Sequence, residues 1–243
     1  MELGLGAHLV ARTGFCVHPA EALAQVPKVG GTKDVDLQAL AGRSPTHVLV
    51  NVDETRLETI TALRTCSPVP EIVVTHPCRP EDNLELVERI AAVFKEVPGV
   101  RERAAALKAA LALELVATRP DGRTPQRVLY LIWRRPWMTV ARDTYLSSML
   151  ARIGWATLPQ LEGGPTGAAR YPIVKGDEPW LATVDRVLLS SEPYRFDERH
   201  SAEVRALAPQ ARVQCVDGEL LSWYGPRAVA GLRYLRELAD QTG

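Results

Sequence analysis

The feature that most constrains the fold is a continuous stretch of strong helix-forming residues in the middle of the chain. Residues 100–118 are rich in Ala, Leu, Glu, Arg and Lys and contain no Gly or Pro. Pro120 and Gly122 follow directly and end the helical pattern. A helix of this length extends for about 28 Å at ~1.5 Å per residue, which is long enough to bridge two lobes.

Short apolar runs alternate with helical segments on both sides of this stretch. Five runs are typical of buried strands: 47–52, 71–75, 127–133, 186–190 and 211–216. Strands that alternate with helices predict mainly parallel sheets covered by helices on both faces. We therefore expect an α/β fold with two Rossmann-like lobes joined by a single long backbone helix. The expected boundaries are 1–96, 97–123 and 124–243.

Charge and composition exclude several classes of protein. Lys plus Arg and Asp plus Glu each number 29, so the formal net charge is zero, and no basic run is present. Binding to nucleic acid or to an anionic membrane is therefore not expected. No apolar stretch approaches the ~20 residues that span a bilayer. The first eight residues lack the features of a signal peptide, which predicts a cytosolic location unless the true start lies upstream.

The cysteines and histidines do not show the spacing of a metal site. The four cysteines, Cys16, Cys66, Cys78 and Cys215, form no Cys-x-x-Cys pair, and the five histidines lie in separate segments. No metal site is expected. A Cys66–Cys78 disulfide remains an alternative to thiols that pack as small apolar groups.

No motif in the chain predicts catalysis. The segment that contains Thr32 and Lys33 lacks the spacing of a phosphate-binding loop, and there is no Gly-x-Ser-x-Gly. Cys16 and His18 could meet as nucleophile and base, but local packing in a turn is the simpler interpretation. The acids Asp53 and Glu54 begin a helix, where acids are favoured without any catalytic role. We expect no catalytic residues.

Aromatic residues lie instead at strand ends and in loops. Trp133 and Trp137 follow a strand, Trp223 lies between the last strand and the last helix, and Tyr171 and Phe15 lie in loops. Ligands of parallel α/β sheets bind outside the carboxyl ends of the strands, and a large flat ligand is held by rigid aromatic walls. Basic side chains beside them would contact acidic or polar groups of such a ligand: Lys33, Arg134 and Arg135. The alternative is that the aromatic residues fold onto the core, which we expect for Trp155 and Trp180.

Seven segments together resemble the helical-backbone metal receptors, the periplasmic substrate-binding proteins of cobalamin and iron-siderophore ABC importers. The segments are 3–6, 12–19, 27–37, 48–50, 131–139, 190–196 and 223–227. The resemblance is strongest to the cobalamin-binding type. It implies a rigid, monomeric two-lobed protein in the periplasm, without catalysis or an intrinsic cofactor. It also implies a corrinoid or ferric siderophore bound in the cleft between the lobes.

The resemblance also implies which residues contact the ligand. Phe15 stands where cobalamin-binding members place a Tyr, Tyr171 stands at a Trp position, and Thr32 replaces a Trp of the cobalamin-binding type. The ligand-contacting set implied in this way is Phe15, Thr32, Lys33, Trp133, Arg135, Trp137, Met138, Tyr171, Trp223 and Tyr224.

Docking to an ABC permease requires one surface Glu in each lobe of such proteins. Glu178 fits this position in the second lobe, whereas Gln38 occupies it in the first, where Asp36 or Glu54 would have to substitute. The first strand and helix of the family are absent from the start of the chain, which indicates a truncated start or a smaller lobe. Two alternatives stay open: a cytosolic corrinoid or chelate binder without a permease, and an α/β enzyme of unknown chemistry.

Overall fold

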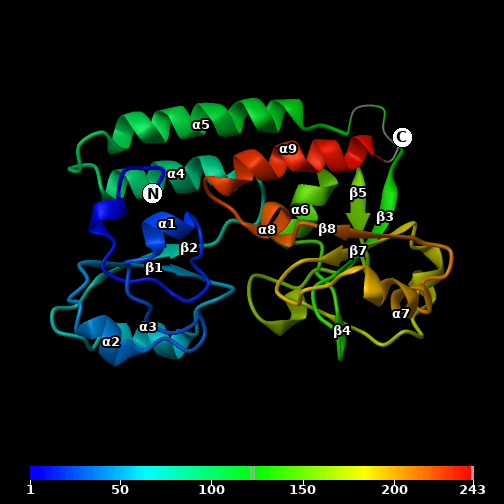
Figure 1. The fold of residues 1–243 in the computed structure, drawn as a ribbon, viewed down its shortest axis with the longest axis horizontal. Coiled ribbons are helices and arrows are strands. Elements are labelled where there is room, and N and C mark those ends of the chain that lie inside the picture. The colour runs from blue at the N-terminus through cyan, green and yellow to red at the C-terminus, as the bar shows by residue number, and fades with distance from the viewer. Residues whose placement is uncertain (121, 123, 242–243) are drawn as a thin grey trace. The chain divides into compact units, whose positions relative to one another are not determined.

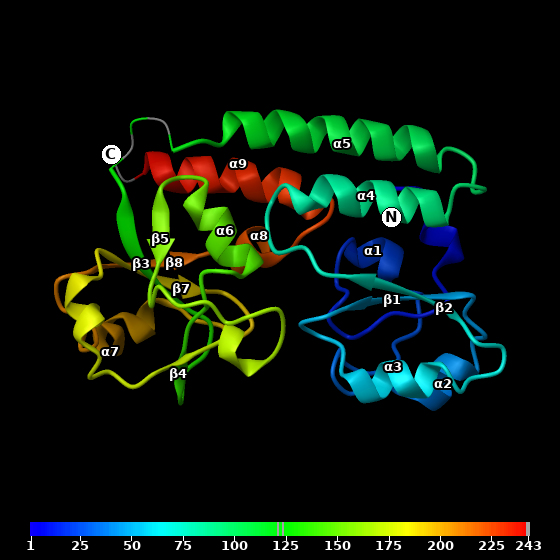
Figure 2. The same cartoon turned by 180° about the vertical axis from the view of Figure 1, so that it is seen from behind.

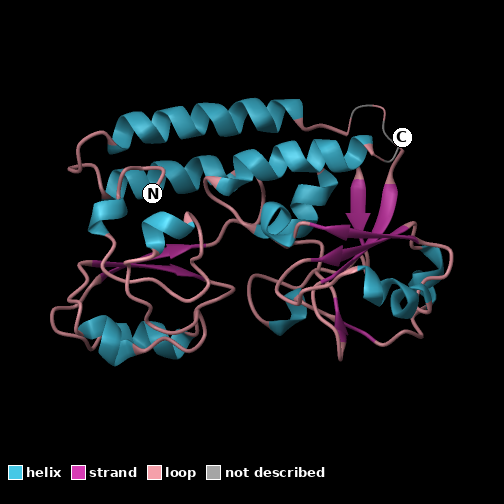
Figure 3. Cartoon of the chain, viewed as in Figure 1, coloured by secondary structure: helices cyan, strands magenta, loops and turns pink. Residues whose placement is uncertain are grey.

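The computed structural model describes residues 1–120, 122 and 124–241 (Figures 1, 2 and 3). By their internal contacts these residues divide into two compact units. The first, here the N unit, comprises Met1–His76 and Arg89–Ala105. The second, the C unit, comprises Pro77–Glu88 and Ala106–Gly243.

Two helices contribute residues to both units. Helix α4 (Asp82–Val93) begins in the C unit and ends in the N unit, whereas α5 (Val100–Ala117) begins in the N unit and ends in the C unit. Helix α5 is the long helix expected at residues 100–118. The chain thus passes between the units at three places, after residues 76, 88 and 105. The boundaries 1–96, 97–123 and 124–243 stay predictions.

The N unit contains a small parallel sheet. Its strands β1 (His47–Asn51) and β2 (Glu71–Thr75) pair in parallel, with Val50 opposite Val74. Both were expected from their apolar runs. The unit's short helices are η1 (Gly6–His8), α1 (Ala20–Leu23), α2 (Leu37–Ala41) and α3 (Leu57–Leu63). A compact core formed by Val29, Leu40 and Leu63 lies among these elements.

The C unit is built on a four-stranded parallel sheet (Figure 3). The strand order is β5 (Trp155–Thr157), β3 (Gln126–Leu131), β7 (Arg186–Ser190) and β8 (Arg212–Val216). A second small sheet pairs β4 (Trp137–Met138) with β6 (Ile173–Val174) in antiparallel orientation. The helices of the unit, besides parts of α4 and α5, are α6 (Tyr145–Ala151), η2 (Ala168–Arg170), η3 (Pro179–Thr183), η4 (Glu198–His200), α7 (Ser201–Arg205), α8 (Gly218–Ser222) and α9 (Arg227–Asp240).

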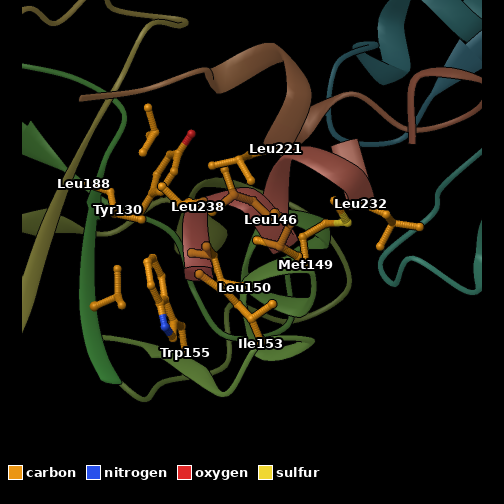
Figure 4. Close-up of a cluster of buried hydrophobic side chains, with 14 of the residues drawn as sticks. Tyr130, Leu146, Met149, Leu150, Ile153, Trp155, Leu188, Leu221, Leu232 and Leu238 are labelled. Atoms are coloured by element: carbon orange, nitrogen blue, oxygen red, sulfur yellow. The ribbon is translucent and has the colours of Figure 1, made fainter. Parts of the chain in front are cut away.

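Both faces of the larger sheet are buried. Figure 4 shows Tyr130, Leu188 and Trp155 packed with side chains of α6, α8 and α9. Leu129, Leu131 and their neighbours pack on the opposite face. Because successive side chains of a strand point to opposite faces, burial of both faces explains why the apolar residues run without a break through 128–131 of β3 and 187–189 of β7. Trp155 lies in the first of these two clusters and Trp180 packs against the second, so both fold onto the core as expected.

The C-terminal half of α5 is joined to α9 by an ion-pair network. Glu114 lies 2.5 Å from Arg233 Nε and 2.7 Å from Arg236 Nη1. Arg236 also donates to Thr118 Oγ1 at 2.9 Å. Since Glu114 is buried, these two arginines provide the partners that its carboxylate requires.

The structure describes all four cysteines, and none of them forms a disulfide, so the Cys66–Cys78 bridge is not formed. Cys66 Sγ donates to the carbonyl oxygen of Ala62 at 3.7 Å, and Arg170 Nη2 donates to Cys78 Sγ at 3.7 Å. No helix among the described residues has the length and apolar character needed to cross a bilayer.

Candidate functional site

The carboxyl ends of β3, β7 and β8 lie at one edge of the C-unit sheet, because the three strands are adjacent and parallel. The loop after β3 carries Trp133, the loop after β7 carries Glu192, and the segment after β8 carries Trp223. This is the edge at which open α/β sheets bind ligands. The loops at this edge carry Trp133 and Trp223, two of the aromatic residues expected at the site.

A tight hairpin after β3 presents two tryptophans. Ile132 N donates to the carbonyl oxygen of Met138 at 2.9 Å, and Met138 N donates to that of Trp133 at 3.1 Å. Arg135 occupies the turn with a φ of 63°, in the left-handed region that non-glycine residues seldom adopt. The hairpin leaves Trp133 41% exposed and Trp137 half-buried.

The two tryptophans rest on an aromatic cluster that follows β7. Trp137 stacks on Phe196 with a centroid distance of 6.1 Å and ring planes 14° apart. Trp133 meets Tyr194 edge to face at 5.7 Å, and Tyr194 contacts Phe196 at 4.6 Å. We did not predict Tyr194 or Phe196, although their position directly after a buried strand was a usable signal. The cluster holds Trp133 and Trp137 as a rigid apolar surface.

Trp223 is held by a carboxylate. Its Nε1 donates to Glu192 Oε1 at 2.7 Å, and Ser222 Oγ donates to the same oxygen at 2.6 Å. The Arg227 guanidinium lies 5.1 Å from the Trp223 ring centroid and pairs with Glu219 at 2.9 Å. Burial raises the pKa of Glu192, and the nearby acids add to the rise, while the two donated hydrogen bonds oppose it. Sequence reasoning missed Glu192 as a site residue.

The segment that follows Trp223 is fixed from its other side by Asn83 of α4. Gly225 N donates to Asn83 Oδ1 at 2.5 Å, and Asn83 Nδ2 donates to Tyr145 Oη at 3.0 Å. Tyr224 packs edge to face on Tyr145, with 6.1 Å between ring centroids. Asn83 is fully buried, so these bonds satisfy a side chain that would otherwise be costly to bury.

The remaining expected contacts of the C unit differ in exposure. Arg134 pairs with Glu203 at 2.6 Å, whereas Arg135 is exposed at the tip of the hairpin. Met138 is half-buried in β4. Tyr171 is half-buried against the core cluster of Figure 4. Arg135 is therefore better placed than Arg134 to meet an acidic group of a ligand.

In the N unit, two paired loops bring the Phe15 ring close to Gly31, the residue before Thr32. Gly14 N donates to the carbonyl oxygen of Gly30 at 2.8 Å, and this bond ties the two loops together. Phe15 is 65% exposed, an unusual state for a large apolar ring. Thr32 Oγ1 donates to Glu54 Oε2 at 3.0 Å, and the neighbouring Lys33 is exposed.

Of the expected docking residues, Glu178 directly precedes η3 and Gln38 lies on α2. Both carboxylate oxygens of Glu178 accept backbone hydrogen bonds, from Lys175 N and Gly176 N, each at 2.8 Å. Burial favours a higher pKa for Glu178, but these bonds outweigh it and the pKa is lowered. Gln38 is exposed on α2, and Asp36 caps that helix by accepting from Ala39 N at 2.9 Å.

A groove of about 470 Å³ lies elsewhere in the C unit, and none of the expected ligand contacts lines it. Two of its polar side chains already bond within the protein: Arg152 pairs with Glu81 at 2.6 Å and also donates to the Leu115 carbonyl oxygen. Its lining residues are Glu81, Leu115, Val116, Arg119, Pro120, Ala151 and Arg152. Within the described part of the chain, no three His, Cys, Asp or Glu residues are placed to hold a metal ion.

Comparison with known proteins identifies the fold. No family model matches the chain, and no curated protein matches it. The periplasmic vitamin B12 binding protein of Vibrio cholerae matches with a TM-score of 0.76 and 16% identity, over 99% of this chain and 92% of that one. This chain has the fold of the periplasmic substrate-binding proteins. The expected α/β class with parallel sheets is thereby confirmed.

Two heme-binding proteins are similar to the same degree. A periplasmic heme-binding protein of Pseudomonas aeruginosa matches with a TM-score of 0.78 and 20% identity, over 100% of this chain and 88% of that one. The apo form of a periplasmic heme-binding protein from Roseiflexus sp. RS-1 matches with a TM-score of 0.75 and 19% identity, over 100% of this chain and 94% of that one. At these identities the likeness establishes the fold, and the ligand has to be argued from the residues.

Proposed function

We propose that this chain is the substrate-binding component of an ABC importer and binds a large planar metal chelate, a corrinoid or a heme. The observation that carries the proposal is the aromatic surface of Trp133 and Trp137 at the strand ends of the C unit. Its rings are rigidly supported by Tyr194 and Phe196. Several solved proteins that share the fold bind vitamin B12 or heme, which are flat ligands of the size that such a surface suits.

The individual contacts are proposals of the same kind. In the C unit these are Trp133, Arg135, Trp137, Met138, Tyr171, Trp223 and Tyr224, with the exposed Arg135 suited to an acidic side group of the chelate. In the N unit the exposed Phe15 offers an apolar contact, and Thr32 and Lys33 offer polar ones.

The chelate is identified by titrating the purified protein with cyanocobalamin, hemin and a ferric siderophore in separate calorimetric experiments. The proposal predicts saturable, one-to-one binding of cyanocobalamin or hemin, with no chemical change in the chelate. Binding of the siderophore alone would keep the receptor function but exclude a planar ligand. No heat of binding with any of the three would contradict the proposal.

The partner of the chain is proposed to be an ABC permease, with a monomeric receptor docking through Glu178 and the region of Gln38. The two backbone hydrogen bonds to Glu178 fix the direction of its carboxylate. The alternative is a binder of the same chelate that serves no permease. Uptake of labelled chelate into membrane vesicles that carry the importer's permease separates the two, since only a transport receptor stimulates it.

A further inference from the structure

Glu192 lies at a junction of three elements of the C unit. It follows β7, its side chain accepts hydrogen bonds from Ser222 and Trp223 at the end of α8, and its backbone bonds to Ser190. Ser190 Oγ donates to the Glu192 carbonyl oxygen at 2.5 Å, and Tyr130 Oη of β3 donates to Ser190 Oγ at 2.8 Å. The position of Glu192 is thus set by the sheet itself.

The first turn of α8 packs closely against this residue. A Cβ atom added to Gly218 would lie 2.8 Å from Glu192 Cγ and 2.3 Å from Ser190 Oγ, so only glycine fits there. Gly218 N donates to Ser191 Oγ at 2.9 Å. The start and the end of α8 are therefore both attached to the loop that follows β7.

Half-burying a carboxylate is unfavourable unless the protein supplies hydrogen-bond donors. The indole Nε1–H is the only polar group of a tryptophan side chain. One hydrogen bond from Nε1 therefore restricts the orientation of the ring. Glu192 meets both requirements. Two donors reach one of its carboxylate oxygens, and one of these donors is the Trp223 indole. Such bonds to a charged acceptor are about twice as strong as neutral ones.

We propose that Glu192 is a positioning residue that fixes the Trp223 indole at the ligand-binding edge of the C-unit sheet. This inference rests on the proposed function, in which Trp223 contacts the chelate. Glu192 holds the indole at its Nε1 edge. The Arg227 guanidinium lies 5.1 Å from the ring centroid and adds a cation–π contact. Glu192 orders the ring before a ligand arrives, which lowers the entropic cost of binding.

The charged groups around Glu192 come from the neighbouring elements. Asp217 and Glu219 approach it from the segment after β8 and from α8, and Arg227 of α9 neutralises Glu219. Tyr234 of α9 accepts from Asp217 N at 2.9 Å. Among the described residues, the Trp223 indole and the Ser222 hydroxyl both donate to the Glu192 carboxylate and hold its side chain.

The test compares Glu192→Ala and Glu192→Gln with Glu237→Ala, which removes an exposed glutamate of α9. The readout is the indole N–H resonance of Trp223 in a proton–nitrogen spectrum of the full chain, assigned with Trp223→Phe. We expect Glu192→Ala to move this resonance toward that of a solvent-exposed indole. Glu192→Gln keeps an acceptor oxygen and should largely preserve it, and Glu237→Ala should leave it unchanged.

A second readout is the affinity for cyanocobalamin and hemin. Loss of the bond in Glu192→Ala should weaken binding about tenfold, and Glu192→Gln should restore most of it. An unchanged indole resonance in Glu192→Ala would overturn the proposal. Equal loss of affinity in both variants would also overturn it, because it would indicate that the carboxylate charge itself contacts the ligand. If the parent binds neither chelate, the proposed function fails, and the resonance alone decides the positioning role.

Discussion

Trp137 and Phe196 lie nearly parallel, with ring planes 14° apart and centroids separated by 6.1 Å. Phe196 is buried and Trp137 is half-buried, so the inner ring supports the outer one. The pair joins the hairpin after β3 to the loop after β7, so that side chains of two strand-end loops form one aromatic surface. The proposed ligand binding depends on this surface.

Phe196→Ala should destabilise the C unit and loosen Trp137. Removing a buried phenylalanine leaves a cavity and costs about 3–5 kcal/mol. The matched control is Phe15→Ala, since Phe15 is 65% exposed and its loss should change the free energy of unfolding by less than about 0.5 kcal/mol. Urea unfolding followed by circular dichroism measures both. Similar effects of the two substitutions would show that Phe196 does not support the aromatic surface.

Glu192→Gln should stabilise the protein at pH 7. Burial raises the pKa of Glu192 in the folded state, so folding favours the neutral acid, and that contribution is lost as the pH rises through the folded-state pKa. Glutamine stays neutral at every pH and avoids this loss. The difference in the free energy of unfolding between the parent and Glu192→Gln should vanish below pH 4.5, the ordinary pKa of a glutamate. Denaturant unfolding at a series of pH values tests this, and a less stable variant at pH 7 would contradict it.

The effect of Glu114→Gln on the free energy of unfolding should depend on pH in the opposite way to that of Glu192→Gln. Burial favours a higher pKa for Glu114, but the hydrogen bonds and charges of Arg233 and Arg236 outweigh it and lower the pKa. The ionised carboxylate therefore stabilises the fold above pH 4.5, and the stabilisation is lost as the pH falls. We expect the substitution to cost about 1–3 kcal/mol at neutral pH, and less in acid.

The control for Glu114→Gln is Glu237→Gln, which changes an exposed glutamate on α9. This variant should unfold at the same denaturant concentration as the parent. A cost of Glu114→Gln that stays constant from pH 7 to pH 4 would show that the ion pairs with Arg233 and Arg236 do not stabilise α5 against α9.

Much of the architecture was predictable because local pattern and burial agree. Residues 128–131 of β3 are all apolar since both faces of the strand are buried there, and α5 is a continuous run of strong helix formers. The position of Trp133 and Trp137 at a strand end could also be predicted, since they follow an apolar run, and their contact with a ligand stays a prediction. The fold comparison then confirmed the α/β class with parallel sheets.

The partners of the site residues could not be predicted, because they lie far apart in the chain. Glu192 and Trp223 are 31 residues apart, and they meet only because β7 and β8 are neighbours in the sheet. Asn83 bonds to Gly225 across 142 positions and to Tyr145 across 62. Periodicity describes which face of an element is buried, but not which distant residue supplies a hydrogen bond to it.

Trp137→Ala should weaken binding of the chelate while the fold is retained. The ring contributes aromatic contact area to a flat ligand, and its loss should raise the Kd about tenfold or more. Trp180→Phe is the matched control because Trp180 packs against the core and belongs to no expected contact. Circular dichroism checks that both variants are folded, and a normal Kd in Trp137→Ala would exclude this ring from the site.

The most direct measurement is a calorimetric titration that compares the parent with the Trp137→Ala, Trp223→Ala double variant. The ligand is cyanocobalamin or hemin, whichever the parent binds. We predict saturable one-to-one binding to the parent, and binding at least a hundredfold weaker to the folded double variant. Equal affinities of the parent and the double variant would contradict the proposed function, because neither Trp137 of the aromatic surface nor Trp223 would then take part in holding the ligand.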